Sequence, residues 1–450
     1  MQDTIAAIST GSALSAIGII RISGEGTLPV VDKLFEPLNK TKMSAAPDRL
    51  LTYGRLVSSQ GEVLDLCLCT ISRGPKSYTG EDTAELQCHG SPAMLRQALF
   101  EIFKAGARQA LPGEFTKRAF LNGRMDLTQA EAVIDLIHAE TAEAAKNAAG
   151  QLGGAIFKKA ERIYNSLADI SAHYHAVLDY PDEDIEPFEL VQYQKTMEAA
   201  AADLKTLLKS RVHGDVLKSG AQAAIIGLPN AGKSSLLNAL LGYDRAIVTD
   251  IPGTTRDTIE EKISLGGVLL RLIDTAGLRE TRDEIERIGV SRSHEAARGA
   301  ALVIAVLDGT EPLSAAQREI ISMAQAAPKS IIVLTKTDLG EAKSQIPGAI
   351  KISNVTMEGF DELEAAVRAH FPEPEGIAAG EILTNARQVE AISRAAAALE
   401  AAICALAQGI TPDAVLTSTE DAMGALSEMT GASIREDITT RIFERFCVGK

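Results

Sequence analysis

The chain of 450 residues is 46% hydrophobic and 23% charged, the balance of an ordinary globular protein. Its length allows roughly three domains of about 150 residues each. Its formal net charge of −15 argues against indiscriminate binding of nucleic acids, which depends on neutralising many phosphates, but leaves room for a local basic face. There is no N-terminal targeting signal and no apolar stretch near the ~20 residues of a membrane helix. We therefore expect a cytoplasmic protein without membrane contact.

The five cysteines, Cys67, Cys69, Cys88, Cys404 and Cys447, are too few and too scattered for a disulfide framework. None belongs to a Cys-x-x-Cys pair, so the spacing does not predict a structural zinc site. Cys67 and Cys69 alternate within an apolar run and are expected to face a core from one strand. A redox pair at these two positions is the less favoured alternative.

Residues 1–115 mix short apolar runs with turn-forming residues. The runs at 17–22 and 64–71 predict strands, and the apolar spacing of 93–105 predicts a helix. These elements indicate an N-terminal domain of the α/β or α+β class.

Residues 116–215 are rich in alanine and repeat apolar residues at helical spacing. The pattern predicts long helices over residues 116–121, 126–149, 155–178 and 189–211. The acidic, proline-containing segment 179–187 interrupts them and is most simply a solvated turn.

The region 216–375 has strand-like runs that alternate with helical stretches, which is typical of parallel β/α winding. The runs cover residues 222–227, 269–274, 301–308 and 330–335. A proline-containing linker at 372–376 follows, and residues 376–450 are again helical. We expect a multidomain α/β and all-α protein, in which a P-loop domain of parallel strands flanked by helices is inserted into a helical domain.

A phosphate-binding loop, Gly227-Leu-Pro-Asn-Ala-Gly-Lys-Ser234, lies between a predicted strand and a predicted helix. Gly227 and Gly232 let the backbone curl so that its N–H groups converge on phosphate oxygens. Lys233 is expected to reach the β- and γ-phosphates, and the Ser234 hydroxyl to bind Mg²⁺.

Two later motifs complete a guanine-nucleotide site. Asp274 would hold Mg²⁺ through water, and Gly277 would approach the γ-phosphate. Asp338 accepts from guanine N1–H and the 2-amino group, a donor pair that adenine lacks. Thr335 stands where Asn is usual, which predicts a modest effect on affinity. Ser353 is expected in the last base-contacting loop, although Asn replaces the customary Ala after it.

The segment 249–257 between these motifs reads as the first switch loop, with Thr255 as the second hydroxyl on Mg²⁺. Leu278 stands where many GTPases carry a glutamine that orients water, so another group must do so or hydrolysis is slow. The expected GTP contacts are Asn230, Ala231, Gly232, Lys233, Ser234, Ser235, Thr249, Asp250, Ile251, Pro252, Gly253, Thr254, Thr255, Asp274, Thr275, Ala276, Gly277, Thr335, Lys336, Thr337, Asp338 and Ser353.

The phosphate loop, the Gly-Thr-Thr-Arg-Asp at 253–257 and the Asp-Thr-Ala-Gly-Leu-Arg at 274–279 resemble the TrmE–Era–Der group of GTPases. Motifs at 3–10, 18–24, 77–90 and 446–450 narrow the resemblance to the MnmE (TrmE) family of tRNA modification GTPases, over the whole chain. The loop at 9–18 departs from the Pro- and Gly-rich turn that is usual in the family.

The resemblance implies that the chain works with MnmG, a partner that uses FAD and NADH. Together they would add an aminomethyl or carboxymethylaminomethyl group to C5 of the wobble uridine of certain tRNAs. The one-carbon unit would come from a tetrahydrofolate, 5-formyl or methylene. The N-terminal domain resembles a folate-binding module that also forms a homodimer, and the matched folate residues are Arg21, Glu85, Arg124 and Lys450. Cys447 is not assigned a catalytic role.

The resemblance also implies potassium-activated hydrolysis. Asn230 and the loop residues Thr249, Ile251 and Thr254 would hold K⁺, whose charge replaces an arginine finger. Glu286 would orient the attacking water, making Glu286, Asn230 and Lys233 the expected catalytic residues. The alternative for Glu286 is a solvated acid at a helix start.

Two other functions stay open at this point. One is a ribosome-assembly or signalling GTPase that acts as a nucleotide-controlled binding module. The other is a folate-dependent one-carbon transferase whose GTPase is regulatory. The chain has no C-terminal Gly-x-x-Gly RNA-binding domain and no second phosphate loop, which favours the tRNA-modifying function.

Overall fold

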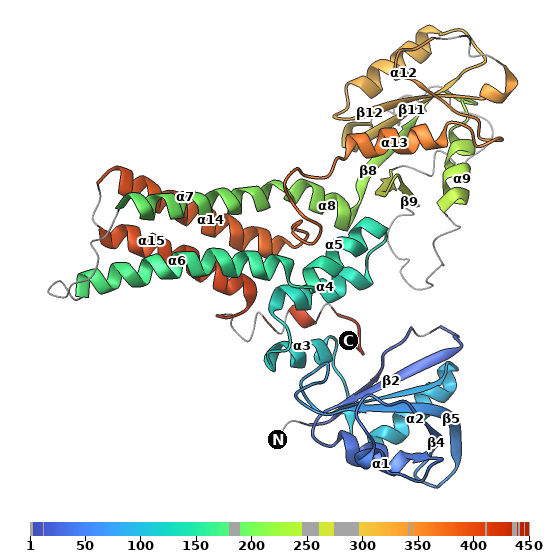
Figure 1. Ribbon diagram of the computed structural model, residues 1–450. Coiled ribbons are helices and arrows are strands. Elements are labelled where there is room, and N and C mark those ends of the chain that lie inside the picture. The colour runs from blue at the N-terminus through green and yellow to red at the C-terminus, as the bar shows by residue number, and fades with distance from the viewer. Residues whose placement is uncertain are drawn as a thin grey trace. The chain divides into compact units, whose positions relative to one another are not determined.

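The computed structural model describes residues 3–11, 13–179, 190–244, 261–273, 297–340, 343, 345–409, 412–433, 439, 442–444 and 446–449. The chain is drawn in Figure 1, and its backbone contacts divide it into two compact units. The first comprises residues 1–134, 151–200 and 394–450, and the second comprises residues 135–150 and 201–393.

The N-terminal part of the first unit is a seven-stranded sheet in the order β3-β4-β5-β6-β2-β1-β7. Its strands are β1 (Ile5–Ile8), β2 (Ile17–Ser23), β3 (Phe35–Pro37), β4 (Thr52–Val57), β5 (Val63–Ser72), β6 (Thr83–His89) and β7 (Arg108–Gln109). The helices α1 (Thr27–Leu34) and α2 (Pro92–Ala105) cover one face. The predicted strands at 17–22 and 64–71 and the predicted helix at 93–105 are therefore confirmed.

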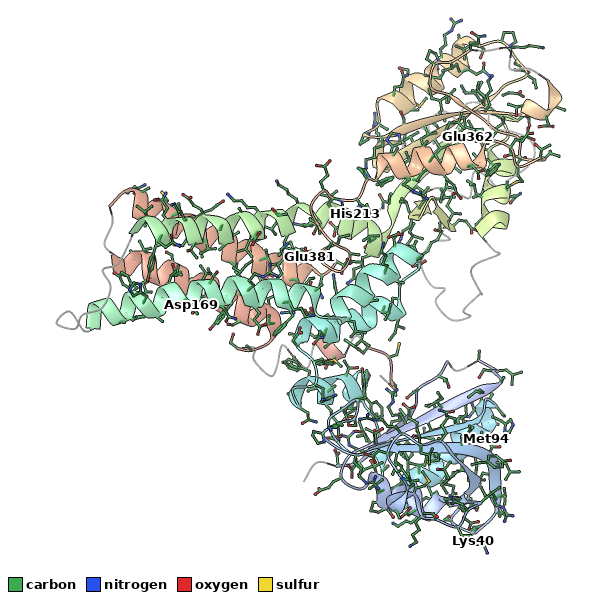
Figure 2. All side chains as sticks on the ribbon, in the orientation of Figure 1. Lys40, Met94, Asp169, His213, Glu362 and Glu381 are labelled. Carbon is green, nitrogen blue, oxygen red and sulfur yellow. The ribbon has the colours of Figure 1, made fainter. Side chains whose placement is uncertain are left out.

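Alternation along the strands builds the core of this domain. Ile20, Ile22 and Leu86 point to the helix-covered face and are at most 1% exposed. Cys67 and Cys69 face the same core, as the alternation predicts. Met94 of α2, labelled in Figure 2, packs against it.

The helical part begins with α3 (Glu114–Leu121), α4 (Leu127–Ile137), α5 (Ala142–Leu152) and α6 (Ala155–Asp179). It continues with α7 (Leu190–Lys209), α8 (Arg211–Ser219), α14 (Ala386–Ala407) and α15 (Pro412–Thr430). Within the first unit, α6 packs along α15.

The prediction of one helix over 126–149 is wrong, because the structure has α4 and α5 with a break between them. The Thr141 hydroxyl accepts the Ala144 backbone N–H at 3.1 Å and caps the start of α5. Threonine is a favourable N-cap residue, so this local hydrogen bond starts a new helix at a point where the apolar repeat had suggested a continuous one. Asp126 caps α4 in the same way, accepting the N–H groups of Thr128 and Gln129.

The second unit contains a six-stranded sheet in the order β13-β12-β11-β8-β10-β9. Its strands are β8 (Ala221–Ile226), β9 (Glu261–Leu265), β10 (Val268–Leu272), β11 (Leu302–Asp308), β12 (Ser330–Thr335) and β13 (Ile350–Lys351). The pairings are parallel except that β9 is antiparallel to β10, and this edge hairpin was not predicted.

Helices cover both faces of this sheet. The helices are α9 (Lys233–Asp244), α12 (Ala315–Gln325) and α13 (Phe360–His370). Along β11, Ile304 and Val306 belong to the core with α9 and α13, whereas Ala305 and Leu307 belong to the core with α12. Burial on both faces explains why this strand is a continuous apolar run.

In the described part of the chain, no helix has both the length and the apolar composition needed to span a bilayer.

Candidate functional site

The phosphate loop connects the end of β8 to the start of α9, as the sequence predicts. Asn230 and Gly232 have left-handed backbone angles, with φ of 59° and 92°. A Cβ atom at Gly227 would lie 2.3 Å from the carbonyl oxygen of Val306, so only glycine fits there. This backbone forms a concave loop at a helix N-terminus, an arrangement that binds anions.

Lys233 folds back over the loop. Its Nζ donates to the carbonyl oxygens of Gly227 and Leu228 at 2.9 and 2.8 Å. Burial lowers the pKa of this ammonium group. The phosphates of a nucleotide would take the place of these two carbonyls as partners of the lysine. Ser234 and Ser235 follow in the first turn of α9, and Asn230 is exposed in the loop.

Thr335 ends β12 and is fully buried. Its hydroxyl oxygen lies 2.6 Å from the Ala231 carbonyl oxygen and 3.1 Å from that of Leu307. The side chain therefore ties the end of β12 to the phosphate loop and to β11. A threonine hydroxyl suffices for this link at a position where asparagine is usual.

The two loops after β12 and β13 carry the residues that the sequence predicts to contact the base. The Ser353 hydroxyl donates to Asp338 Oδ1 at 2.9 Å and accepts the Val355 and Thr356 backbone N–H groups. Ser353 is buried, whereas Asp338 is exposed. The arrangement leaves a carboxylate that can accept from guanine, oriented by a buried hydroxyl.

Lys336 sits in the left-handed region with φ of 61°. Its Nζ forms an ion pair with Asp308 Oδ2 at 2.6 Å. Burial would raise the pKa of Asp308, but hydrogen bonds from Lys336 and Thr310 outweigh it, so the pKa lies below the usual value for aspartate. Thr337 begins the short 3-10 turn that carries Asp338.

The structure thus gathers, at one end of the second sheet, the predicted residues from 230–235 and those from 335–338 and 353. The predicted switch residues 249–255, the motif 274–277, the candidate Glu286 and the folate candidate Lys450 lie outside the described residues.

A separate pocket lies on the N-terminal sheet. Arg21 and Glu85 are register partners on β2 and β6, and their side chains pair at 2.9 Å. They line a cavity of about 160 Å³ together with Thr70, Ser72, Tyr78 and Thr83. Cross-strand pairing therefore brings together two of the four residues implied by the resemblance.

Tyr78 contributes to this pocket without having been singled out in the sequence. The Arg21 guanidinium lies 5.1 Å from the centre of its ring, and its hydroxyl is 2.9 Å from Thr116 Oγ1. Arg124 is not in the pocket lining, but its Nε donates to the Ser77 carbonyl at 3.1 Å and so supports the segment that carries Tyr78. The only sequence feature that pointed to Tyr78 as a pocket residue was its position inside the 77–90 motif.

The C-terminal motif lies against the N-terminal domain within the first unit. Val448 forms a β-bridge with Pro112, and the Gly113 N–H donates to the Cys447 carbonyl at 3.3 Å. The Ser9 hydroxyl donates to the Gly449 carbonyl at 2.9 Å. Cys447 is exposed.

Two known protein families match consecutive parts of the chain. The GTP-binding protein TrmE N-terminus matches residues 4–124, and the MnmE helical domain matches residues 127–447.

Full-length relatives agree with these matches. The tRNA modification GTPase MnmE of Roseiflexus sp. strain RS-1 is 43% identical over 465 residues, covering 100% of this chain and 99% of that protein. The protein of the same name from Thermus thermophilus is 41% identical and covers 100% of both chains. Among solved structures, the G domain of the T. maritima FeoB iron transporter is 28% identical, covering 34% of this chain and 99% of that one, with a TM-score of 0.24. On the strength of the end-to-end relatives, the chain belongs to the MnmE family of tRNA modification GTPases.

Proposed function

We propose that this GTPase is activated by potassium and drives a modification at C5 of the wobble uridine of certain tRNAs, with a one-carbon unit from a tetrahydrofolate bound to its N-terminal domain. As a member of its family, the chain hydrolyses GTP with Mg²⁺. The observation that carries the proposal is that one chain combines a formed phosphate loop with a second, separate pocket lined by an arginine–glutamate pair.

The nucleotide half of the proposal assigns roles to the loop residues. Lys233 binds the β- and γ-phosphates, and the hydroxyls of Ser234 and Thr255 would hold Mg²⁺, which when bound neutralises charge on the phosphates. Asp338, oriented by Ser353, selects guanine. Asp274 would hold Mg²⁺ through a water molecule.

Potassium would supply the charge that other GTPases obtain from an arginine finger. Asn230 is exposed in the phosphate loop and has a left-handed backbone angle. Its exposed side chain supports its assignment as a potassium ligand. Carbonyls of Thr249, Ile251 and Thr254 would complete the site. Since residue 278 is leucine, we assign the orientation of the attacking water to Glu286.

The folate half rests on the N-terminal pocket. The Glu85 carboxylate can accept from the aminopyrimidine edge of a pterin, and the Tyr78 ring offers an aromatic face beside it. Pockets for drug-sized ligands usually measure at least ~300 Å³, whereas this cavity measures about 160 Å³. We therefore assign the pterin ring to the cavity and the anionic tail to its surroundings, where Arg124 and Lys450 would meet it.

An exposed apolar patch supports a homodimer through the N-terminal domain. Tyr53 on β4 is 49% exposed, and Leu66 on β5 is 45% exposed. Leu38 and Leu51 are also about half exposed beside them. Tyr53 and Leu66 lie on paired neighbouring strands, and exposed apolar side chains that gather on a surface mark protein contact sites. We propose that two N-terminal domains associate here, and that the dimer joins MnmG and tRNA in the cytoplasm.

The test is nucleoside analysis of tRNA from cells that lack this chain. We expect wobble uridines without their C5 substituent, restored by the wild-type gene and not by Lys233→Ala. Unchanged wobble uridines together with a ribosome-assembly defect would support the nucleotide-controlled binding module instead.

A further inference from the structure

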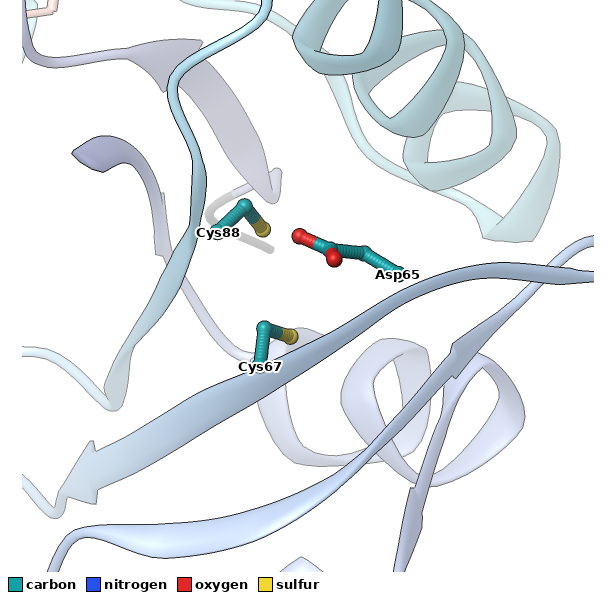
Figure 3. Close-up of side chains that lie close together, drawn as sticks. All are labelled: Asp65, Cys67 and Cys88. Carbon is teal, nitrogen blue, oxygen red and sulfur yellow. The ribbon is translucent and has the colours of Figure 1, made fainter. Parts of the chain in front are cut away.

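Two thiols and a carboxylate meet on the helix-covered face of the N-terminal sheet (Figure 3). Asp65 and Cys67 come from β5, and Cys88 comes from β6. One carboxylate oxygen and the two sulfur atoms all lie within 4.8 Å of one another. Leu68 pairs with Gln87 in the register of these strands, and continuing it sets Cys67 opposite Cys88. The spacing of the cysteines along the chain gave no sign of this cluster.

A fourth donor lies beside the carboxylate. The His89 ring nitrogen Nδ1 is 2.7 Å from Asp65 Oδ1. The His89 side chain is 75% exposed and stands outside the group of three, so its ring would have to turn to join them, whereas the Asp65 side chain is only 8% exposed. The backbone N–H groups of Leu66 and His89 both donate to this carboxylate at 2.8 Å. They hold Asp65 in place, as outer-sphere hydrogen bonds do for metal ligands.

We propose that Asp65, Cys67, Cys88 and His89 form a binding site for a transition-metal ion of the zinc class. Zn²⁺ takes four ligands in a tetrahedron from sulfur, imidazole and carboxylate groups, with adjacent ligand atoms ~3.5 Å apart at the usual bond lengths. The three ligand atoms lie within 4.8 Å of one another, and rotation of the two cysteine side chains would adjust their separations to this spacing. Mg²⁺ and K⁺ prefer oxygen ligands, whereas this cluster offers two sulfur atoms. The cluster would therefore select a different ion from the nucleotide site.

The binding step involves no electron transfer. The two S–H bonds break, two sulfur–metal bonds form, and both protons pass to solvent. Asp65 supplies an oxygen, and the His89 ring supplies a nitrogen from its neutral form. Two thiolates, one carboxylate and a doubly charged ion together carry one net negative charge. The two backbone N–H groups that donate to the Asp65 carboxylate would partly offset this charge.

Apolar side chains enclose the sulfur atoms. Glycines stand beside both cysteines on the strands that flank β5 and β6, Gly54 of β4 next to Cys67 and Gly18 of β2 next to Cys88. Phe35 packs on Gly54 and Leu95 packs on Gly18 so closely that a Cβ atom would clash. The cysteines are 4% and 2% exposed, so a bound ion would be shielded from water on that side.

The consequence of binding would be to fasten β5 to β6. These same strands carry Thr70 and Glu85, which are register partners in the pocket described above. The metal would therefore stabilise the strand pair that supports the pocket. The metal proposal does not depend on folate being the ligand of that pocket.

The test uses Co²⁺ as a spectroscopic probe on the full-length, fully reduced protein, in a Cys404→Ser/Cys447→Ser background that removes the two exposed thiols. We expect one equivalent of Co²⁺ per chain to produce thiolate-to-metal charge-transfer absorption, which Zn²⁺ abolishes by displacement. Co²⁺ in the nucleotide site would not give this band, because that site offers only oxygen ligands. Cys67→Ala and Cys88→Ala should each remove most of the absorption.

Cys69→Ala is the matched control, since Cys69 lies on the same strand and face, is fully buried and stands outside the cluster. It should keep the band. Because His89 is exposed, His89→Ala should fold normally and weaken Co²⁺ binding at least tenfold. A folded, reduced wild-type protein without the band would overturn the proposal, and so would a band that survives Cys88→Ala or is unaffected by His89→Ala. If two buried thiols react with a thiol reagent only after the protein is reduced, Cys67 and Cys88 form a disulfide and the metal proposal is wrong.

Discussion

Replacing Thr335 by valine tests how the end of β12, beside the proposed base-binding loop, supports the phosphate loop. Valine keeps the shape of the side chain and removes only the hydroxyl, which lies 2.6 Å from the Ala231 carbonyl oxygen and 3.1 Å from that of Leu307. The residue is 0% exposed, so no water replaces the lost donor. Losing one partner of a buried hydrogen bond costs ~1–3 kcal/mol.

We expect this cost to appear as easier local opening of the phosphate loop. Hydrogen exchange of residues 227–232 should speed up, and the Kd for GTP should rise roughly tenfold, the factor that corresponds to ~1.4 kcal/mol. Thr356→Val is the control, because Thr356 is exposed. If Thr335→Val exchanges and binds GTP like the wild type, the hydroxyl does not couple β12 to the loop and the reasoning fails.

Three further predictions concern potassium, the dimer and pH. GTP hydrolysis should be faster in KCl than in NaCl. Asn230→Gly should bring the two rates together, and glycine keeps the left-handed backbone of φ 59° without strain. Equal rates of the wild type in both salts would contradict the potassium site. Tyr53→Asp should convert the dimer to a monomer in light scattering while GTP turnover without tRNA persists; an intact dimer would exclude this patch. The pKa of Asp308 in the folded protein lies below the usual aspartate value of ~4. The ion pair of Asp308 with Lys336 therefore stabilises the fold above pH ~4, and this stabilisation is lost as the pH falls through the folded-state pKa. Acid unfolding of Asp308→Asn should consequently depend less on pH than that of the wild type, and identical profiles would contradict this.

Local patterns predicted the parts of the fold that depend on neighbours in sequence. The strand at 330–335 and the phosphate loop before α9 lie where periodicity and glycine spacing set them. The break between α4 and α5 escaped prediction, because one Thr141 hydroxyl bond outweighs an apolar repeat that continues through it.

Contacts across strands could not be predicted from spacing. Arg21 meets Glu85, and Cys67 meets Cys88, because β6 lies between β2 and β5. That order is set by packing of the whole sheet, which a single sequence does not display. The folate residues therefore came from family resemblance, and the thiol cluster became visible only in three dimensions.

The central claim is that one chain holds two chemically independent sites. Calorimetric titration of 5-formyl-tetrahydrofolate and of GTP into Glu85→Gln and Asp338→Asn tests it most directly. We expect Glu85→Gln to lose folate affinity and keep its GTP affinity, and Asp338→Asn to do the reverse. Glu85→Gln that still binds folate like the wild type would contradict the account, as would a single substitution that abolishes both ligands in a folded protein.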